Sequence, residues 1–239
     1  MAVKALFLNC SLKPSPDLSN TQALIDKVAA FMERQGAETE TVRIADETVG
    51  TGISSDLGPG DGWPAILKKV FACDILVIGT PIWLGHMSSL CQRVIERLDD
   101  TYSAYDPTNG QFPLYNKVGA VIVTGNEDGA QATSSEVLYA LQSFGCTIPP
   151  NSDVYWVGDA GAGPSYVAAG AERHFYTNKV AIWMAYNAVW MAELLRANPC
   201  PTDLTALANE VREVSDPPKV DPHEIDRERR EAARQAADH

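Results

Sequence analysis

A polar loop near the start of the chain combines hydroxyl side chains with a lysine. It follows an apolar run over residues 3–8 and precedes an amphipathic stretch that runs to about residue 35. The side chains in it that can donate hydrogen bonds to an anion are those of Ser11, Lys13, Ser19, Asn20 and Thr21. A helix that begins at the end of this loop would add free N–H groups and the positive end of its dipole. The loop therefore predicts a site for a phosphate monoester.

The same residues also fit a plainer interpretation, an ordinary capped helix with a polar entry loop, because Ser, Thr and Asn are common N-caps. The absence of known phosphate-binding motifs excludes some classes of phosphate ligand. The loop contains neither G-x-x-x-x-G-K-[ST] nor G-x-G-x-x-G, which argues against a P-loop nucleotidase and against the dinucleotide fingerprint. A receiver domain would have acidic residues directly after the first strand, where this chain has Asn9-Cys10-Ser11.

The composition is that of a water-soluble globular protein, with 45% hydrophobic residues and a net charge of −12. The negative charge argues against nucleic acid and anionic membranes as partners. No apolar run is long enough to span a bilayer, and the first residues do not resemble a secretory signal. The five cysteines are scattered, odd in number and without C-x-x-C spacing, which favours reduced thiols over disulfides or a metal site. These features predict a cytoplasmic protein without a metal.

Apolar runs predict five strands, and the stretches between them predict helices. The strands are expected over residues 3–8, 38–44, 73–80 and 117–124, with a fifth formed by 146–148 and 153–157. Helices are expected from the capping residues to about 35, from Pro64 onward, and over 87–98, 130–144 and 172–197. This alternation indicates a doubly wound parallel sheet between two layers of helices. Five strands favour the flavodoxin-like order 2-1-3-4-5, an α/β/α fold.

In that order, loops that leave the carboxyl ends of the first, third and fourth strands meet at one edge of the sheet. The second of these loops consists of Pro81, Ile82, Trp83, Leu84 and Gly85. The third consists of Thr124, Gly125, Asn126, Glu127, Asp128 and Gly129. Because the topology brings them to the loop of Ser11 and Thr21, the three loops together favour the anion site over the plainer interpretation.

These three loops resemble those of the flavodoxin-like NADPH-dependent FMN reductases and NAD(P)H:quinone oxidoreductases, over about residues 3–197. The resemblance implies one non-covalently bound FMN per subunit and a homodimer or homotetramer. It also implies that NADPH or NADH donates electrons, which pass through the flavin to a quinone or a similar planar small molecule. An electron carrier of the flavodoxin type, without NAD(P)H turnover of its own, is the alternative.

Each loop has a physical role that fits this resemblance. The first would hold the ribityl phosphate, and the third would cover the pyrimidine side of the ring. In the second, backbone N–H groups from Ile82 to Leu84 would reach the polar edge of the flavin, and Trp83 would offer its ring. Because flavin itself accepts hydride, no catalytic acid or base is assigned. For His86, two roles remain open: contact with the flavin or the substrate, and a structural role.

The chain divides into a flavin-binding domain over residues 1–197 and a charged extension over 198–239. Residues 216–239 contain few large apolar side chains, so the extension is expected to be partly disordered. The helix expected over 172–197 carries Trp183, Trp190 and Met191 in addition to its core positions. This surplus of large apolar side chains favours a subunit contact.

Overall fold

The computed structural model describes residues 1–216. The expected tail, apart from its first residue, lies outside the described residues. The chain forms a main unit, made of residues 1–106 and 111–201, and a small second unit that contains residues 107–110 and the chain from residue 202 onward. Among the described residues, no helix combines the length and apolar character needed to cross a bilayer.

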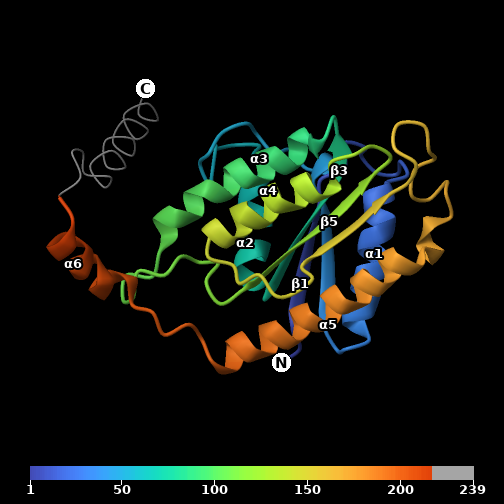
Figure 1. Ribbon diagram of the computed structural model, residues 1–239. Helices are drawn as coiled ribbons and strands as arrows, with labels where there is room; N and C mark the ends of the chain where they lie inside the picture. Colours follow the sequence, from blue (N-terminus) through green and yellow to red (C-terminus); the bar gives the residue numbers. More distant parts are fainter. Residues whose placement is uncertain (217–239) are drawn as a thin grey trace. The chain divides into compact units, whose positions relative to one another are not determined.

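The main unit contains a parallel sheet of five strands in the order β2-β1-β3-β5-β6 (Figure 1). The strands are β1 (Lys4–Asn9), β2 (Glu38–Arg43), β3 (Ile75–Trp83), β5 (Val118–Gly125) and β6 (Asp153–Val157). A two-residue strand, β4 (His86–Met87), pairs antiparallel with the end of β3. The flavodoxin-like order expected from the sequence is therefore confirmed, with β5 and β6 as the fourth and fifth parallel strands.

Helices cover both faces of this sheet (Figure 1). One face carries α1 (Asn20–Glu33) and α5 (Phe175–Ala197), which pack with the side chains of Ala5 and Phe7. The other carries α2 (Trp63–Ala72), α3 (Ser89–Leu98) and α4 (Ala130–Ser143), which pack with Leu6 and Leu8. Because both faces are covered, β1 is apolar at successive positions rather than at alternate ones. Short 3₁₀ turns lie at Ile44–Asp46, Asp99–Ala104 and Ala171–Arg173.

Two expected elements differ from the structure. The third strand continues to Trp83 instead of ending at Thr80, because the chain turns back there and β4 pairs with it. The fifth strand is only Asp153–Val157, since Thr147 makes a single isolated bridge to Val118 before the Pro149-Pro150 pair, which has no N–H groups to extend the ladder.

The long polar segment after β2 is fastened by a buried ion pair. Arg97 on α3 lies 2.5 Å from the Asp61 carboxylate, and their side chains are 0% and 4% exposed. Arg97 also donates to the carbonyl of Gly50, and its guanidinium lies over the ring of Trp63. Hydrogen bonding to Arg97 lowers the pKa of Asp61 to about 2. The pair therefore stays ionised and holds this segment against the helical layer.

The second unit contains a helix that the sequence did not predict, α6 (Leu204–Val214). The side chain of Asp203 caps it by accepting a hydrogen bond from the N–H of Ala206, at 2.9 Å. The N–H of Leu204 donates to the carbonyl of Asn109, which joins the two segments of this unit. None of the helix's residues is buried.

Candidate functional site

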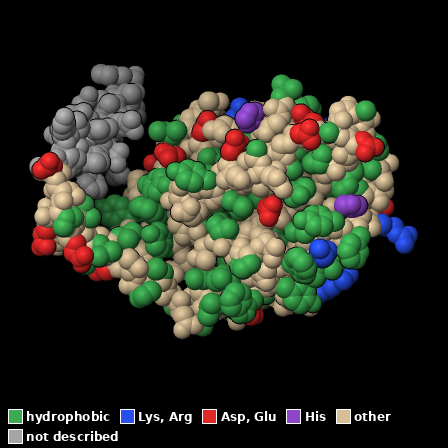
Figure 2. Space-filling model, viewed as in Figure 1, with side chains coloured by type: hydrophobic (Ala, Val, Ile, Leu, Met, Phe, Trp, Pro, Cys, Tyr) green, Lys and Arg blue, Asp and Glu red, His purple; other side chains and the backbone are tan. Residues whose placement is uncertain are grey.

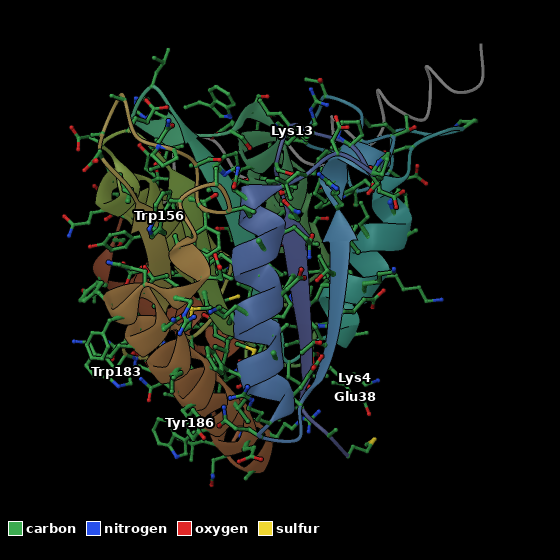
Figure 3. All side chains as sticks on the ribbon, turned by 90° about the vertical axis from the view of Figure 1, so that its right-hand side faces the viewer. Lys4, Lys13, Glu38, Trp156, Trp183 and Tyr186 are labelled. Atoms are coloured by element: carbon green, nitrogen blue, oxygen red, sulfur yellow. The ribbon has the colours of Figure 1, made fainter. Side chains whose placement is uncertain are left out.

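A pocket with a volume of about 190 Å³ lies at the carboxyl ends of β1, β3 and β5. Figure 3 places Lys13 at this end of the sheet, whereas Lys4 and Glu38 mark the opposite end. The pocket is lined by Ser11, Leu12, Lys13, Leu18, Ser19, Asn20, Thr21, Pro81, Ile82, Trp83, Thr124, Gly125, Asn126, Glu127, Ser165 and Tyr166. The three loops that sequence analysis selected thus contribute to a single pocket, together with a fourth segment that it did not select.

Ser11 contributes a buried hydroxyl that has no partner. Among the described residues its Oγ is one of the few buried polar side-chain atoms without a hydrogen bond. Its backbone N–H donates to Oδ1 of Asn9, at 2.9 Å, and the amide of Asn9 in turn donates to Gln22 on α1. Because a buried polar group without a partner is costly, an unpartnered hydroxyl that lines a pocket indicates a ligand acceptor.

The first turn of α1 presents further donors. Ser19 is the N-cap, and its Oγ accepts the N–H of Gln22 at 3.1 Å, which leaves the hydroxyl hydrogen free to donate. The hydroxyl oxygens of Thr21 and Thr124 lie 2.8 Å apart, and both side chains are buried. Since either one can donate to the other, one hydroxyl hydrogen of this pair stays available for a ligand. The helix dipole adds positive potential at the same place.

The loop between β1 and α1 is held in place by residues at the end of β2. Asp46 accepts hydrogen bonds from the backbone and the hydroxyl of Ser15, both at 2.6 Å. Arg43 donates to the carbonyl of Asp17 at 2.8 Å. The hydrogen bonds from Ser15 lower the pKa of Asp46, and the charge of Arg43 lowers it further. The loop is therefore held in place by residues outside the pocket. The residues that line the pocket are not needed for this anchoring.

The second loop is the tip of a β-hairpin. Trp83 pairs with His86, and the two residues between them, Leu84 and Gly85, both have positive φ, 51° and 82°. This conformation is that of a two-residue hairpin turn. Ile82 is buried, whereas Trp83 is 53% exposed at the mouth of the pocket. Leu84 and Gly85 lie beyond the pocket and do not line it.

A close backbone contact joins the third loop to this hairpin. A Cβ at Gly129 would lie 2.7 Å from the Cα and the carbonyl oxygen of Gly85, and Gly129 has a φ of 115°. Glu127 lines the pocket, whereas Asp128 is exposed and, like Gly129, does not line it. The positions of the second and third loops are thus coupled by a contact that admits no side chain.

Residues between β6 and α5 form the fourth wall, which sequence analysis did not select. Ser165 and Tyr166 line the pocket, and Tyr166 is 1% exposed. Burial raises the pKa of Tyr166 to about 12, and nearby Glu172 adds to the shift. The Tyr166 ring packs edge-on against Trp156, with ring centroids 5.6 Å apart. No short motif marks these two residues, so only their position after the last strand could have suggested them.

Two amide side chains that the sequence assigned to the cofactor hold this fourth wall. Asn20 accepts the N–H of Val167 through its Oδ1, at 2.9 Å. Asn126 donates to the carbonyl of Gly163 at 2.9 Å, and its own carbonyl accepts the N–H of Gly161. Both residues line the pocket, but the structure uses their polar groups to fasten the loop that covers it.

The sequence of the main unit matches one family model. Residues 3–160 match the NADPH-dependent FMN reductase family. The chain belongs to this family. The match includes all three of the loops that sequence analysis selected, but it ends before Ser165 and Tyr166, so these two residues of the fourth wall lie outside the matched residues.

One named relative and one solved structure, each described with a flavin phosphate, are similar to this chain along most of its length. The chain is 42% identical over 228 residues to 8-demethyl-8-aminoriboflavin-5′-phosphate synthase of Streptomyces davaonensis, with 90% of this chain and 87% of that protein covered. It is similar to a crystal structure of RosB with a bound intermediate, 8-demethyl-8-formylriboflavin-5′-phosphate. That similarity has a TM-score of 0.83 and 38% identity, and covers 92% of each chain.

A third relative shares only this domain. The chain is 40% identical over 211 residues to a protein of Mycobacterium bovis named divalent metal cation transporter MntH. The match covers 86% of this chain but 31% of that protein, so the name of the whole protein carries no argument here. Within residues 1–216, moreover, no group of three or more His, Cys, Asp or Glu side chains is placed to hold a metal ion.

The donors fit the phosphate end of FMN, the ligand in the family's name. Hydroxyls of Ser11, Ser19 and the Thr21–Thr124 pair surround the N-terminus of α1, where an anion is stabilised. The volume of about 190 Å³ is below the range of roughly 300–1,000 Å³ usual for a whole ligand of this size. The pocket therefore suits the phosphate and the chain that adjoins it better than the whole molecule.

His86 does not line the pocket at the carboxyl ends of the strands. Its Nδ1 is 3.4 Å from the Glu136 carboxylate, and its side chain is 71% exposed. Both residues border a separate, wide groove of about 770 Å³ between α3 and α4. The structure thus places His86 beside α4 and not in the pocket.

Proposed function

We propose that this protein binds FMN in the pocket at the carboxyl ends of β1, β3 and β5 and works as an NAD(P)H-dependent oxidoreductase. The observation that carries the proposal is the unpartnered, buried Ser11 hydroxyl beside the N-terminus of α1, within a pocket built from the three expected loops. In this proposal electrons pass from NADPH or NADH through the flavin to a quinone or another planar acceptor. When bound, the flavin supplies the hydride chemistry.

In this proposal the chain's own residues bind and orient the flavin. Ser11, Ser19 and Thr21 donate to the phosphate, and Lys13 adds a positive charge at the edge of the pocket. Pro81 to Trp83 and Gly125 to Glu127 would border the flavin ring, and backbone N–H groups of the hairpin would reach its polar edge. Ser165 and the buried Tyr166 complete the lining and would shield the bound group from water. No residue is proposed to hold or move a proton.

A second candidate has its own observation in favour. The synthase of Streptomyces davaonensis matches this chain along most of both lengths, and its name describes a flavin phosphate with an amino group in place of the 8-methyl group. The RosB structure holds a flavin with a formyl group at that position. In this candidate, riboflavin 5′-phosphate is the substrate and its 8-methyl group is oxidised. Oxidation of a methyl to a formyl group removes four electrons, so it needs an electron acceptor such as dioxygen.

One pair of assays separates the two candidates. The purified protein is loaded with FMN, and oxidation of NADH and NADPH is followed with benzoquinone as acceptor. In parallel, the loaded protein is incubated in air, with and without ammonium or an amino acid as amino donor, and the flavin is then analysed by mass spectrometry. Turnover with unchanged flavin supports the oxidoreductase. Flavin that has gained one oxygen and lost two hydrogens supports the second candidate.

Two further outcomes bear on the alternatives. Rapid one-electron exchange with a partner reductase, without turnover of either nicotinamide, would favour an electron carrier of the flavodoxin type. A colourless protein that FMN does not colour would contradict both candidates, because each requires the flavin in the pocket.

A further inference from the structure

The groove between α3 and α4 is larger than the pocket at the strand ends, and the proposed function does not use it. Figure 1 shows these two helices on the same face of the sheet. The groove volume of about 770 Å³ lies within the range of roughly 300–1,000 Å³ usual for small-molecule sites. Its lining combines apolar, aromatic and acidic side chains, among them Met87, Ile95, Asp99, Tyr102, Glu136 and Tyr139. The groove therefore has the size and the mixed lining of a ligand site.

Tyr102 gives the groove a fixed aromatic wall. Its ring packs edge-on against Phe112, with ring centroids 4.7 Å apart, and lies 5.6 Å from the ring of Phe144, which also lines the groove. The Tyr102 hydroxyl donates to the carbonyl of Ser143 at 2.9 Å. Because these three contacts already hold the ring, little side-chain freedom is lost when a ligand packs against it.

The two carboxylates of the groove differ in what they already contact. Glu136 lies 3.4 Å from His86, which precedes α3. Asp99 directly follows α3, and among the described residues no side chain donates to its carboxylate. Burial raises the pKa of Tyr102, and the neighbouring Asp99 and Tyr139 raise it further. Asp99 therefore stands close to two aromatic side chains, with its charge not yet paired.

We propose that this groove binds an arylalkylammonium ion, which is a protonated amine that carries a flat apolar group. The ammonium lies beside Asp99 and against the rings of Tyr102 and Tyr139, where ionic and cation–π attraction act together. The flat group lies along Met87 and Ile95, so that its apolar surface is removed from water. The site is separate from the flavin pocket and does not depend on the proposed function.

Charge complementarity favours a cation over other small ligands. Among the described residues, the lining holds two carboxylates and neither lysine nor arginine. The net charge of −12 adds negative potential, and Figure 2 shows acidic side chains on the face that carries α3 and α4. An anion would lose hydration beside two like charges. A neutral ligand would fill the apolar part of the groove but would leave the Asp99 carboxylate without a counter-charge.

The test is isothermal titration calorimetry of the full chain with three probes of similar shape and different charge. The probes are phenethylammonium, neutral phenethyl alcohol and anionic hydrocinnamate. Phenethylammonium should bind with a dissociation constant of about 1 mM or lower, and the alcohol at least about ten-fold more weakly. Hydrocinnamate should bind more weakly still, because its charge is repelled.

Three variants locate the site. Asp99→Asn keeps the shape of the side chain and removes its charge, so it should weaken phenethylammonium binding about ten-fold and hardly change that of the alcohol. Tyr139→Ala removes one ring of the wall and should weaken the binding of both probes. Glu96→Gln is the matched control, because Glu96 lies on α3 one turn before Asp99 but does not line the groove. It should bind both probes as wild type does.

Asp99 and Tyr139 are exposed, so the variants should fold, and unchanged melting temperatures check this. Absence of phenethylammonium binding at a concentration of about 20 mM would overturn the proposal. So would equal affinities for the amine and the alcohol, or equal losses in Glu96→Gln and Asp99→Asn. Self-association of the wild type that Tyr139→Ala abolishes would show that a second copy covers the groove, which also overturns the proposal. None of these measurements involves flavin, so their outcome is independent of the proposed function.

Discussion

The hydroxyl oxygens of Thr21 and Thr124 lie 2.8 Å apart, although 103 positions separate the two residues in the chain. Thr21 belongs to the first turn of α1, and Thr124 to the end of β5. Their contact therefore joins the first and third loops in the lining of the pocket. Because both side chains are buried, each hydroxyl depends on the other for a partner within the protein.

Replacing one of these threonines by valine should destabilise the protein, because the other hydroxyl is left buried without a partner. Thr21→Val or Thr124→Val should each lower the free energy of unfolding by about 1–3 kcal/mol, measured by urea denaturation. The double variant removes both hydroxyls and should be less destabilised than the sum of the two single variants. Thr51→Val, at an exposed position, is the control and should stay within about 0.5 kcal/mol of wild type. Strict additivity would show that the two hydroxyls do not interact.

The ion pair between Arg97 and Asp61 should dominate the stability of the segment after β2. Asp61→Asn keeps the shape but leaves a buried guanidinium without its counter-charge, which costs about 3–5 kcal/mol. The matched control is Glu40→Gln, which breaks the exposed pair between Lys69 and Glu40 and should cost less than about 1 kcal/mol. Similar losses for the two variants, measured in urea, would contradict the buried role of Asp61.

The same pair predicts a pH dependence. The pKa of Asp61 is about 2 in the folded protein and about 3.9 in an unfolded chain, so its folded pKa is depressed. Its stabilising contribution is therefore complete above about pH 4 and is lost as the pH falls toward 2. Stability of the wild type should fall more steeply across this window than that of Asp61→Asn. Parallel curves for the two proteins would rule out this assignment.

Gly129 should tolerate substitution less well than another glycine with positive φ. In Gly129→Ala the new Cβ meets the backbone of Gly85 at 2.7 Å, so the hairpin has to move. Gly161→Ala suffers similar backbone strain, with a φ of 82°, but its Cβ meets nothing within 4 Å. We expect Gly129→Ala to lose about 1–3 kcal/mol more stability than Gly161→Ala and to bind FMN more weakly. Equal effects on melting temperature and FMN affinity would show that the backbone contact is unimportant.

Much of the fold was predictable because its signals are local. Apolar runs over residues 3–8 and 117–124 indicated strands buried on both faces, and the alternation with helices fixed the sheet order. The convergence of the three loops followed from that order. The hairpin at Leu84 was not predictable, because a leucine with positive φ gives no compositional signal. Helix α6 was missed because its apolar positions, such as Leu207 and Val211, are few and exposed.

The parts of the site that the sequence did not provide depend on long-range contacts. Asn20 and Asn126 have side chains suited to a ligand, and only the fold shows that they also hold residues 161–167. Tyr166 enters the pocket because that segment folds back over α1, where Val167 bonds to Asn20, 147 positions away in the chain. Contacts between residues so far apart produce no spacing pattern in the sequence. The polar residues at the strand ends therefore identified the pocket. They did not show which of their hydrogen-bonding groups are already used within the protein.

We propose that the loop of Ser11 holds a phosphate. Because the Ser11 hydroxyl has no partner within the protein, Ser11→Ala should leave the melting temperature nearly unchanged. Ser19→Ala should lower it, since loss of an N-cap costs about 1 kcal/mol. Ser135→Ala, on the exposed surface of α4, serves as the control for both.

The most direct measurement is the affinity of wild type and Ser11→Ala for FMN and for riboflavin, which lacks the phosphate, by fluorescence titration. A hydrogen bond to a charged group contributes roughly 1.5–3 kcal/mol, so the variant should bind FMN about ten- to a hundred-fold more weakly. Its affinity for riboflavin should hardly change, and wild type should bind riboflavin far more weakly than FMN. Equal affinity of wild type for the two ligands, or an equal loss of both in Ser11→Ala, would contradict the phosphate site.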